Sequence, residues 1–429
     1  MTVLVVGGGG REHAVCAAIK KSPKCTRLLC APGNGGIAKI AECFPTVSAT
    51  DVDAVVELAK RENVDYVAVT TDEALAAGTV DALEVVGIPA FGPRKNAAII
   101  ESSKAFSKAL MKKYNIPTAK YEIFDERSAA VEYVKSQGAP IVVKADGLAL
   151  GKGVVVAQTV DEAIEFIDEL MLNGKFGASG AKVVIEEYLT GREVTALVLT
   201  DGKTLMPLPS SMDHKRVYDN DEGPNTGGMG AISPSPLYSR EFADASFQRI
   251  FIPTMNALNA ESRTFKGVIY FELMLTTDGP KVIEYNARFG DPETQAVLPL
   301  IKSDMLELML SVTEERLSEM SLELTREASC CVVVASGGYP VKYDTGKKIS
   351  GIDDTEALDA IVYHAGTKLI ADGEYVTSGG RVLGVTCTAA DLPTAIQRAY
   401  SAVEKISFDG MHYRKDIGRR IGSDDRRAI

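Results

Sequence analysis

Two hydrophobic patterns alternate along the first part of the chain. Residues 2–6 are apolar and β-branched, and they run into the glycines at 7–10 and then a helical pattern from Arg11. Further strands are predicted at 26–31, 66–69 and 89–91, with helical stretches between them. Strands that alternate with helices are typical of an open, doubly wound α/β domain, here of about 100 residues.

The pattern changes twice in the middle of the chain. An amphipathic helix is predicted from Ser102 to near Tyr114, where Asn115-Ile116-Pro117 ends it. The segment 121–189 then reads as a small separate lobe, with strands at 140–146, 154–156 and 183–189. From 192 to 300 the chain returns to a larger core, which opens with a hairpin across Asp201-Gly202.

The stretch from Gly267 to Gln295 predicts two strands and a turn. Val268–Thr276 is apolar apart from Glu272, Thr277–Pro280 has turn chemistry, and Lys281–Arg288 forms the second strand. Pro280 lacks the N–H that a two-residue Asp278-Gly279 turn would need, so we expect a three-residue loop.

That register places Glu272 opposite Glu284, and two facing carboxylates repel unless a cation lies between them. Side chains alternate across a strand, so Glu284, Asn286 and Arg288 share one face. Mg²⁺ prefers oxygen ligands and shares them with phosphates, so the row predicts a metal and polyphosphate site. The alternative is a solvated strand face with a salt bridge to Arg288.

After a helical pattern at 304–320, the C-terminal part predicts strands at 330–335, 361–365 and 382–388 and a helix at 392–406. Strands beside one long helix suggest an α+β or barrel-like unit. We therefore expect four parts. They are an N-terminal α/β domain (1–102), a core (103–120 and 190–325), a lid lobe (121–189) and a C-terminal domain (326–429).

Composition narrows the class of protein. The 429 residues carry a net charge of −11 and are 45% hydrophobic, which argues against a general nucleic-acid or anionic-membrane binder. No apolar run approaches a membrane span, and the N-terminus lacks the features of a signal peptide. The seven cysteines are scattered without a metal-like spacing, as expected for thiols in a reducing cytoplasm.

The glycine loop at 7–10 has the strand–turn–helix geometry that binds phosphate in doubly wound folds. Its spacing fits GxGxxG only loosely, and the predicted second strand ends in Pro32-Gly33-Asn34 without the acid that a dinucleotide site needs. A smaller phosphorylated substrate, with Arg11 as an added cation, therefore suits the loop better than NAD.

Two further glycine-rich segments suggest phosphate contacts. Residues 147–153 form a hairpin that resumes as a strand, so they can close over phosphates with Lys144 and Lys152 offsetting the charge. Residues 210–230 form a long polar loop with basic residues at its start, and loops this long in compact domains are usually functional. The alternatives are a simple flexible turn and a plain surface loop.

The motifs taken together resemble the glycinamide ribonucleotide synthetase family of ATP-grasp ligases. The resemblance rests on VLVVGGGGREHA at 3–14, APGNGG at 31–36, ADGLALGKGVVV at 145–156, DHKR at 213–216, GPNTGGMGA at 223–231, EYNARFGDPETQ at 284–295, GGRVLGVT at 379–386 and YRKDIG at 413–418. It covers essentially the whole chain.

The resemblance implies a fold and a reaction. The fold is an N-terminal α/β domain, an ATP-grasp core with a mobile lid, and a C-terminal domain. In the reaction ATP phosphorylates the carboxylate of glycine, and the amine of 5-phosphoribosylamine attacks the acyl phosphate to give glycinamide ribonucleotide, ADP and phosphate. ATP and Mg²⁺ or Mn²⁺ would then be required, in a cytoplasmic enzyme that we expect to be a monomer, with a dimer as the alternative.

The predicted site follows from the motifs and the resemblance. Metal ligands are predicted at Glu272, Glu284 and Asn286. Contacts to ATP are predicted at Lys104, Lys144, Gly151, Lys152, Gly153, Glu186, Glu187, Leu189 and Glu193. Catalytic roles are predicted for Arg288, Lys215 and Asp213. Substrate contacts are predicted at Gly9, Gly10, Arg11, Glu12, Asn34, Gly35, Asp213, His214, Lys215, Thr226, Gly227, Gly228, Met229, Gly230, Arg288, Gly290, Asp291, Pro292, Glu293 and Thr294.

Two departures from the family pattern bear on this assignment. Family members often carry Gly where this chain has Glu272, so Glu272 is either a third metal ligand or a spectator. Where the family often has a Gly-Pro-Glu loop, this chain has Thr70-Thr71-Asp72-Glu73. Three alternatives stay open: another ATP-grasp carboxylate–amine ligase, a nicotinamide-dependent oxidoreductase and a non-catalytic nucleotide sensor.

Overall fold

The computed structural model describes residues 1–149, 153–174 and 177–419. Its N-terminal part is a parallel sheet in the order β3-β2-β1-β4-β5. The strands are β1 (Thr2–Gly7), β2 (Arg27–Pro32), β3 (Glu42–Cys43), β4 (Tyr66–Val69) and β5 (Ala90–Phe91). The helices are α1 (Gly10–Lys20), α2 (Val52–Arg61), α3 (Asp72–Ala77) and α4 (Thr79–Val85). The central position of β1 confirms the predicted doubly wound α/β unit.

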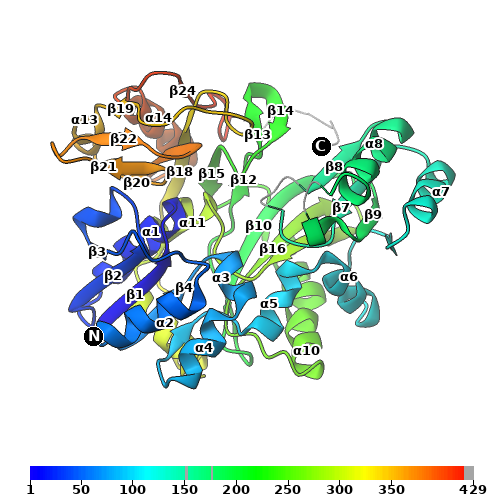
Figure 1. The fold of residues 1–429 in the computed structure, drawn as a ribbon, viewed down its shortest axis with the longest axis horizontal. Coiled ribbons are helices and arrows are strands. Elements are labelled where there is room, and N and C mark those ends of the chain that lie inside the picture. The colour runs from blue at the N-terminus through cyan, green and yellow to red at the C-terminus, as the bar shows by residue number, and fades with distance from the viewer. Residues whose placement is uncertain (150–152, 175–176, 420–429) are drawn as a thin grey trace.

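An antiparallel sheet in the order β11-β10-β16-β17 forms the centre of the molecule (Figure 1). Its strands are β10 (Arg192–Thr200), β11 (Leu205–Pro207), β16 (Gly267–Thr276) and β17 (Gly279–Asn286). The helices of this part are α5 (Lys95–Ser102), α6 (Lys104–Lys113), α9 (Arg240–Ser246), α10 (Ile252–Ala260), α11 (Glu293–Val297) and α12 (Met305–Thr313). The predicted hairpin across Asp201-Gly202 is confirmed as β10–β11.

The β16–β17 hairpin reaches the predicted register by a different route. Thr276 pairs with Gly279, so the turn has two residues, Thr277 and Asp278, and the expected three-residue loop is wrong. The register then shifts by one residue between Glu272 and Leu273, which leaves Ile283 as a bulge and sets Glu272 opposite Glu284. Placing the turn one residue earlier removes the conflict with Pro280, because the ladder no longer needs an N–H from Pro280 in the closing pair.

The lid lobe is a four-stranded sheet in the order β6-β9-β7-β8, shown in cyan to green in Figure 1. Its strands are β6 (Tyr121–Phe124), β7 (Ile141–Ala145), β8 (Val154–Ala157) and β9 (Val183–Glu187). The helices α7 (Arg127–Gln137) and α8 (Val160–Met171) pack together on this sheet. Residues of this lobe between 130 and 185 form an apolar cluster of their own, which makes the lobe a separate packing unit.

The C-terminal part contains an open sheet, so the expected barrel-like closure is wrong. The order is β12-β15-β18-β23-β20, with β24 also paired to β18. The strands are β12 (Met212–Asp213), β15 (Gly230–Ser233), β18 (Ala328–Ser336), β20 (Ile361–His364), β23 (Arg381–Ala389) and β24 (Met411–His412). A separate sheet holds β19 (Lys348–Ile349), β22 (Tyr375–Thr377) and β21 (Thr367–Leu369), and the helices are α13 (Ile352–Glu356) and α14 (Leu392–Val403).

The segment 210–230 is more regular than the predicted loop. Besides β12 at its start and β15 at its end, it forms the hairpin of β13 (Arg216–Tyr218) and β14 (Glu222–Asn225), at the top of Figure 1. Because β15 pairs with β18, this segment joins the sheet of the C-terminal part. Backbone pairing across sequence-distant segments cannot be read from local composition, which is why the prediction missed it.

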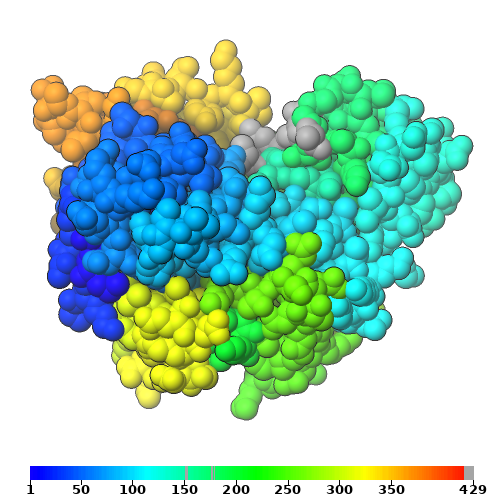
Figure 2. All heavy atoms as spheres, turned by 60° about the horizontal axis from the view of Figure 1, so that its bottom comes forward, coloured from blue at the N-terminus to red at the C-terminus, as the bar shows by residue number. Residues whose placement is uncertain are grey.

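The N-terminal and central parts share continuous apolar cores. Leu4 and Val6 of β1 belong to the same cluster as Phe271 of β16, and Tyr66 donates a hydrogen bond to the Met309 carbonyl in α12 (2.7 Å). Figure 2 shows the yellow residues around α12 packed beneath the blue N-terminal residues. None of the helices in the described ranges has the length and apolarity that crossing a membrane would require.

Candidate active site

A cavity of about 650 Å³ lies where the central sheet, the lid and the segment 210–230 meet. Most of the predicted site residues line it: Arg11, Lys104, Lys144, Gly153, Glu186, Glu187, Leu189, Glu193, Asp213, His214, Lys215, Thr226, Gly227, Glu272, Glu284, Asn286, Arg288, Asp291 and Glu293. Segments separated by more than 200 residues therefore converge on one space, as a ligand site requires.

Lys215 lies beside the facing carboxylates of the hairpin. Glu272 and Glu284 are directly opposite, and the Lys215 ammonium forms a close ion pair with Glu272 and a second one with Glu193 (3.2 Å). Burial opposes its charge, but the Glu193, Glu284 and Asp213 carboxylates outweigh burial and raise the pKa of Lys215. The cation that the facing acids require is therefore, in this structure, a lysine.

The Glu284 carboxylate has no hydrogen-bond or ion-pair partner within the described residues. Burial would raise its pKa, but the fields of Lys104, Lys144, Lys215 and Arg288 prevail and hold that pKa below its usual value. Glu284 is thus an ionised carboxylate with open coordination capacity, surrounded by cations.

A buried carboxylate holds Arg288 in place. The guanidinium forms an ion pair with Glu101 (2.9 Å), whose other oxygen accepts a hydrogen bond from the Ala287 N–H (2.7 Å). The Arg288 side chain is 17% exposed and that of Glu101 only 5%. Because Glu101 fixes both the side chain and the backbone next to it, Arg288 faces the cavity in one orientation.

The hairpin residues fit a magnesium ion by their chemistry. Glu272, Glu284 and Asn286 offer carboxylate and amide oxygens on one wall, and Glu284 has no hydrogen-bond or ion-pair partner in the described ranges. In the part of the chain that the structure describes, no three His, Cys, Asp or Glu side chains are grouped to hold a metal by themselves. Mg²⁺ typically binds one or two protein carboxylates and takes its remaining ligands from phosphates and water, so this sparse set suits it.

The lid wall contains a buried charge cluster that the sequence only partly indicated. Lys144 forms an ion pair with Glu186 (3.1 Å) and donates a hydrogen bond to the Ile283 carbonyl at the hairpin bulge (3.2 Å). The other Glu186 oxygen is held by Lys108 (2.7 Å), a residue outside the predicted set. Glu187 caps the Lys120 N–H (2.9 Å), so the acidic residues at the end of β9 are bonded to protein.

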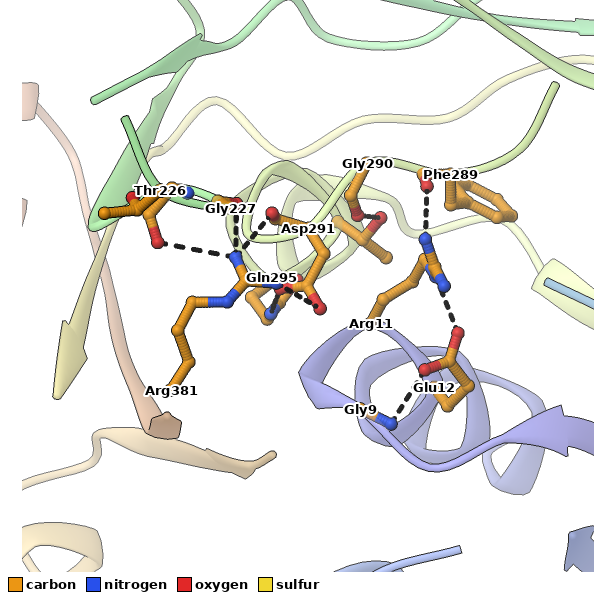
Figure 3. A network of polar contacts seen from close by, with 12 residues as sticks. Gly9, Arg11, Glu12, Thr226, Gly227, Phe289, Gly290, Asp291, Gln295 and Arg381 are labelled. Carbon is orange, nitrogen blue, oxygen red and sulfur yellow. Dashed lines mark hydrogen bonds and ion pairs between the residues drawn. The ribbon is translucent and has the colours of Figure 1, made fainter. Parts of the chain in front are cut away.

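The glycine loop is held by its own helix (Figure 3). Glu12 accepts a hydrogen bond from the Gly9 N–H (2.8 Å) and from the Thr70 hydroxyl (3.0 Å). Arg11 donates to Glu12 (2.6 Å) and to the Phe289 carbonyl (3.2 Å), and it is 8% exposed. A carboxylate therefore lies at the helix start, where a dinucleotide pyrophosphate would need to bind.

Asn34 joins the N-terminal part to the C-terminal sheet. Its amide group donates to the carbonyls of Gly8 (2.9 Å) and His364 (2.8 Å), and its oxygen accepts from the N–H groups of Gly36 and Ile37 (both 2.9 Å). The hydrogen-bonding groups of the Asn34 side chain are thus all paired with backbone groups. A ligand at this position would therefore contact the neighbouring backbone.

Asp213, which is half-buried, and the buried Glu293 form an acidic pair beside the catalytic candidates. Burial, reinforced by the Glu293 charge, raises the pKa of Asp213 well above its usual value. Asp213 accepts a hydrogen bond from the His214 N–H (2.6 Å), and Glu293 accepts one from the Tyr270 hydroxyl (2.8 Å). A carboxylate with a raised pKa binds a proton more strongly than an ordinary carboxylate, which suits a proton acceptor.

The His214 ring is occupied by protein contacts. Its Nε2 accepts from the Gly418 N–H (3.1 Å), which leaves Nδ1 to donate to the Gly230 carbonyl (3.2 Å). Burial lowers the pKa of His214 to about 4, so the ring is neutral at pH 7. His214 therefore links the segment 213–230 to Gly418.

Arg381, at the start of β23, connects two loops that were predicted to contact substrate, and it was assigned no role from the sequence. Its guanidinium donates to the Asp291 carbonyl (2.7 Å) and to the Gly227 carbonyl, and it forms an ion pair with the Asp291 carboxylate (3.2 Å) (Figure 3). Gly228 has φ +107°, and a Cβ there would lie 2.3 Å from Pro292. Close backbone approach and one arginine thus fix these loops together.

A second, more open cavity of about 360 Å³ adjoins the first. Gly9 and Asn34 line it, together with Asp291, Tyr339 and Arg381, which line both cavities. The predicted residues that line neither cavity are Gly10, Glu12, Gly35, Gly228, Met229, Gly230, Gly290, Pro292 and Thr294. Gly151 and Lys152 lie outside the described residues, and the ligand roles of all these residues stay predictions.

Two of the residues that sequence reasoning missed, Lys108 and Glu101, share one recognisable signal. Lys108 lies one turn before Met111, on the buried face of α6, and Glu101 lies on the buried face of α5 with Ala97 and Ala98. A charged residue on an apolar helix face needs a buried partner, so this pattern marks both positions. Arg381 carried no such signal, because its partners are the carbonyls of Gly227 and Asp291 and the Asp291 carboxylate, all in loops distant in the sequence.

Comparison with known proteins covers nearly the whole chain. Residues 1–101, 102–294 and 329–420 match the N domain, the ATP-grasp (A) domain and the C domain of phosphoribosylglycinamide synthetase. Proteins named phosphoribosylamine–glycine ligase are similar in sequence. That of Halalkalibacterium halodurans is 47% identical (98% of this chain, 97% of the relative), and that of Caldanaerobacter subterraneus is 45% identical (97% and 99%).

Solved structures agree with this similarity. The phosphoribosylamine–glycine ligase of Thermotoga maritima matches with a TM-score of 0.85 at 31% identity, covering 97% of this chain and 100% of the other. The biotin carboxylase domain of Hydrogenobacter thermophilus 2-oxoglutarate carboxylase, determined with MgADP, shares the fold at 18% identity (TM-score 0.73; 96% of this chain, 91% of the other). The chain belongs to the phosphoribosylglycinamide synthetase family, with an ATP-grasp domain at its centre.

Proposed function

We propose that the chain joins glycine to 5-phosphoribosylamine, consuming ATP, through a glycyl phosphate intermediate. The products are glycinamide ribonucleotide, ADP and phosphate, a step of purine biosynthesis. The observation that carries this proposal is Glu284, an ionised carboxylate without a hydrogen-bond or ion-pair partner among the described residues, facing Glu272 and surrounded by cations in a cavity of about 650 Å³. Phosphoryl transfer depends on such charge compensation and alignment.

In the first step the carboxylate of glycine attacks the terminal phosphate of ATP, and ADP leaves. Lys104, Lys144 and Arg288 line the cavity; the lysines would offset the charge of the phosphates, and Arg288, oriented by Glu101, would face the transferred group. Glu284 and Asn286, with Glu272 as a third candidate, would hold Mg²⁺, which when bound neutralises phosphate charge and polarises the transferred group.

In the second step the amine of 5-phosphoribosylamine attacks the carbonyl of glycyl phosphate, and phosphate leaves. The attacking nitrogen must lose a proton, and Asp213 is suited to accept it because burial and Glu293 raise the pKa of Asp213. The second cavity suits the sugar phosphate because it adjoins the first across Asp291, Tyr339 and Arg381. Lys215 would release Glu272 when a metal or substrate competes for that carboxylate.

The test is ADP release with glycine and freshly formed 5-phosphoribosylamine, with each component omitted in turn. We expect turnover only with ATP, both substrates and Mg²⁺ or Mn²⁺ together, and no turnover in Glu284→Ala. Activity with a different carboxylic acid but not with glycine would favour another carboxylate–amine ligase. Retained turnover in Glu284→Ala would overturn the metal assignment.

The remaining alternatives have little support in the geometry. A nicotinamide cofactor would bring its pyrophosphate to the start of α1, where the Glu12 carboxylate already accepts the Gly9 N–H. A non-catalytic nucleotide sensor would not need the Asp213–Glu293 acidic pair or the Arg288–Glu101 ion pair. ATP binding without any turnover in the full assay would support the sensor.

We further propose a monomeric enzyme in the cytoplasm whose partners are small molecules. The seven cysteines are unpaired in the structure, which suits a reducing compartment. Sedimentation of the purified chain measures the oligomeric state, and a mass of twice 45.8 kDa would replace the monomer by a dimer.

A further inference from the structure

Lys108 is a buried lysine whose charge the proposed reaction does not use. It lies on α6 in the core, is 2% exposed, and donates hydrogen bonds to Glu186 of the lid strand β9 (2.7 Å) and to the Thr118 hydroxyl (2.8 Å). Burying an ammonium costs several kcal/mol unless it is paired, so its position calls for an explanation.

The contacts of Lys108 lead directly to the nucleotide wall. Its partner Glu186 also forms the ion pair with Lys144 (3.1 Å), the lysine that we propose for the ATP phosphates. Lys144 in turn bonds the carbonyl of Ile283, the bulge residue that sets the position of Glu284. Thr118 donates to the Val282 carbonyl in the same strand (2.7 Å), so both lysines are linked to the hairpin through hydrogen bonds.

The charge count of this cluster is unequal. Two ammonium groups, Lys108 and Lys144, share one carboxylate, Glu186, and all three side chains are 2–4% exposed. If Glu186 had Lys144 as its sole partner, that pair would be neutral and would offer no net charge to a polyanion. With Lys108 compensating Glu186, the cluster carries a net charge of about +1 on the side of the cavity where Lys144 lies.

We propose that Lys108 is a positioning residue that compensates Glu186, so that the charge of Lys144 remains available to the nucleotide phosphates. Lys108 does not touch the nucleotide, since its ammonium is enclosed by Glu186, Thr118 and the Tyr121 ring. This inference rests on the proposed function, because it requires an ATP site beside Lys144.

Burial lowers the pKa of Lys108 to about 8, with Glu186 opposing the shift and Lys144 adding to it. The residue is therefore charged at pH 7, and binding is best measured there. The chain also offers a matched control on the same helix. Lys112 lies one turn later, is exposed, and approaches the same Tyr121 ring (5.7 Å) as Lys108 does (5.8 Å).

The experiment is titration calorimetry of MgATP, without glycine, on the unchanged chain, Lys108→Met and Lys112→Met at pH 7. We expect Lys108→Met to weaken ATP binding about tenfold or more, since one unit charge is lost from a poorly solvated phosphate site. Lys112→Met should bind as the unchanged chain does. Equal affinity in all three would overturn the inference.

A double variant separates charge compensation from a structural role. In Lys108→Met/Glu186→Gln the net charge returns to about +1, carried by Lys144 alone, so we expect ATP affinity to recover to within about threefold of the unchanged chain. If the double variant binds as weakly as Lys108→Met or more weakly, Lys108 acts only through packing and the inference is overturned.

Two further outcomes also test the inference: an unstable Lys108→Met variant and an unchanged chain that does not bind ATP. If Lys108→Met is too unstable to titrate, the inference is judged from the double variant against the unchanged chain, because both carry a net charge of about +1 in this cluster. A double variant that binds at least tenfold more weakly than the unchanged chain would then overturn the inference. Absence of ATP binding by the unchanged chain would overturn both the inference and the proposed function, whereas normal binding with no difference between variants overturns the inference alone.

Discussion

Two walls of the cavity are built in opposite ways. On the wall formed by β16, β17 and the adjoining lysines, which we call the hairpin wall, charged groups such as Glu284 and Lys104 face the cavity without a partner within the described residues. On the interdomain wall, formed by the glycine loop, Asn34, the loops at 226–230 and 290–293, and Arg381, polar side chains are bonded to the protein itself.

The difference indicates a division of labour. A free carboxylate among cations can bind a metal and phosphates, so the hairpin wall supplies charge for chemistry. Side chains that are fully bonded to backbone groups instead fix the shape of the loops, so the interdomain wall supplies fit. Substitutions on the hairpin wall should therefore act on kcat, and substitutions on the interdomain wall on KM and kcat/KM.

The largest effect is expected for Glu284→Gln. The side chain keeps its shape but loses the charge that the surrounding cations stabilise and that a metal would bind, so kcat should fall by about 10³-fold or more. Steady-state ADP release measures it. Lys281→Gln, on the same strand, is the control and should retain kcat within about twofold. A comparable fall in both variants would show that the strand, and not the charge, matters.

The second effect should come from Gly228→Ala on the interdomain wall. Gly228 has φ +107°, and an added Cβ would lie 2.3 Å from Pro292 and 2.6 Å from Asp213, so the two loops would have to separate. We expect kcat/KM for 5-phosphoribosylamine to fall about 10²-fold. Gly87→Ala is the control, because it also has a positive φ (+77°) but nothing within 4 Å of the added Cβ. Loss confined to kcat, with KM unchanged, would contradict the assignment of fit to this wall.

The β16–β17 hairpin shows how far the site could be predicted from the sequence. The facing acids at 272 and 284 could be predicted because strand pairing follows from local pattern and turn chemistry. The register was right although the loop length was wrong, since the bulge at Ile283 offset the earlier turn. The doubly wound order around β1 was predictable for the same local reason.

What the sequence could not give is long-range pairing. β12 and β15 join the C-terminal sheet through β18, and Arg381 bonds carbonyls about 90 and 154 residues away. Nor does composition reveal whether a polar residue faces a ligand or the protein. Asn34 and His214 were predicted to contact substrate, and the structure shows their polar side-chain atoms bonded internally.

A smaller effect on the interdomain wall is expected for Arg381→Lys. One ammonium cannot replace the contacts of the guanidinium to the Gly227 and Asp291 carbonyls and to the Asp291 carboxylate together. We expect KM for 5-phosphoribosylamine to rise about tenfold while KM for ATP changes little. The control is Arg398→Lys in the same domain, whose guanidinium bonds the Thr388 carbonyl (2.9 Å) away from both cavities. A rise in KM for ATP alone would assign Arg381 to the hairpin wall.

The smallest effect concerns pH and the support behind the interdomain wall. His13 accepts a hydrogen bond from the His364 N–H (2.8 Å), next to the Asn34 contact. Burial, with Lys39 nearby, lowers the pKa of His13 to about 4, and burial lowers that of His364 to about 3. In the unfolded chain these two histidines bind protons below pH ~6.5, whereas in the folded chain they stay neutral. Their contribution to stability is therefore full above pH ~6.5 and falls toward pH 4.

The two walls should respond differently to a falling pH. The pKa of Glu284 on the hairpin wall is lowered, so this carboxylate keeps its charge as the pH falls. Each buried histidine should remove on the order of 1–2 kcal/mol of unfolding free energy between pH 7.5 and pH 5. Urea unfolding of His13→Gln should therefore show a loss of unfolding free energy between pH 7.5 and pH 5 that is smaller by about that amount. The control is His412→Gln, at a half-exposed position, which should lose as much as the unchanged chain. An undiminished loss in His13→Gln would mean that acid destabilises the chain elsewhere, and the interdomain wall would then be no more acid-sensitive than the hairpin wall.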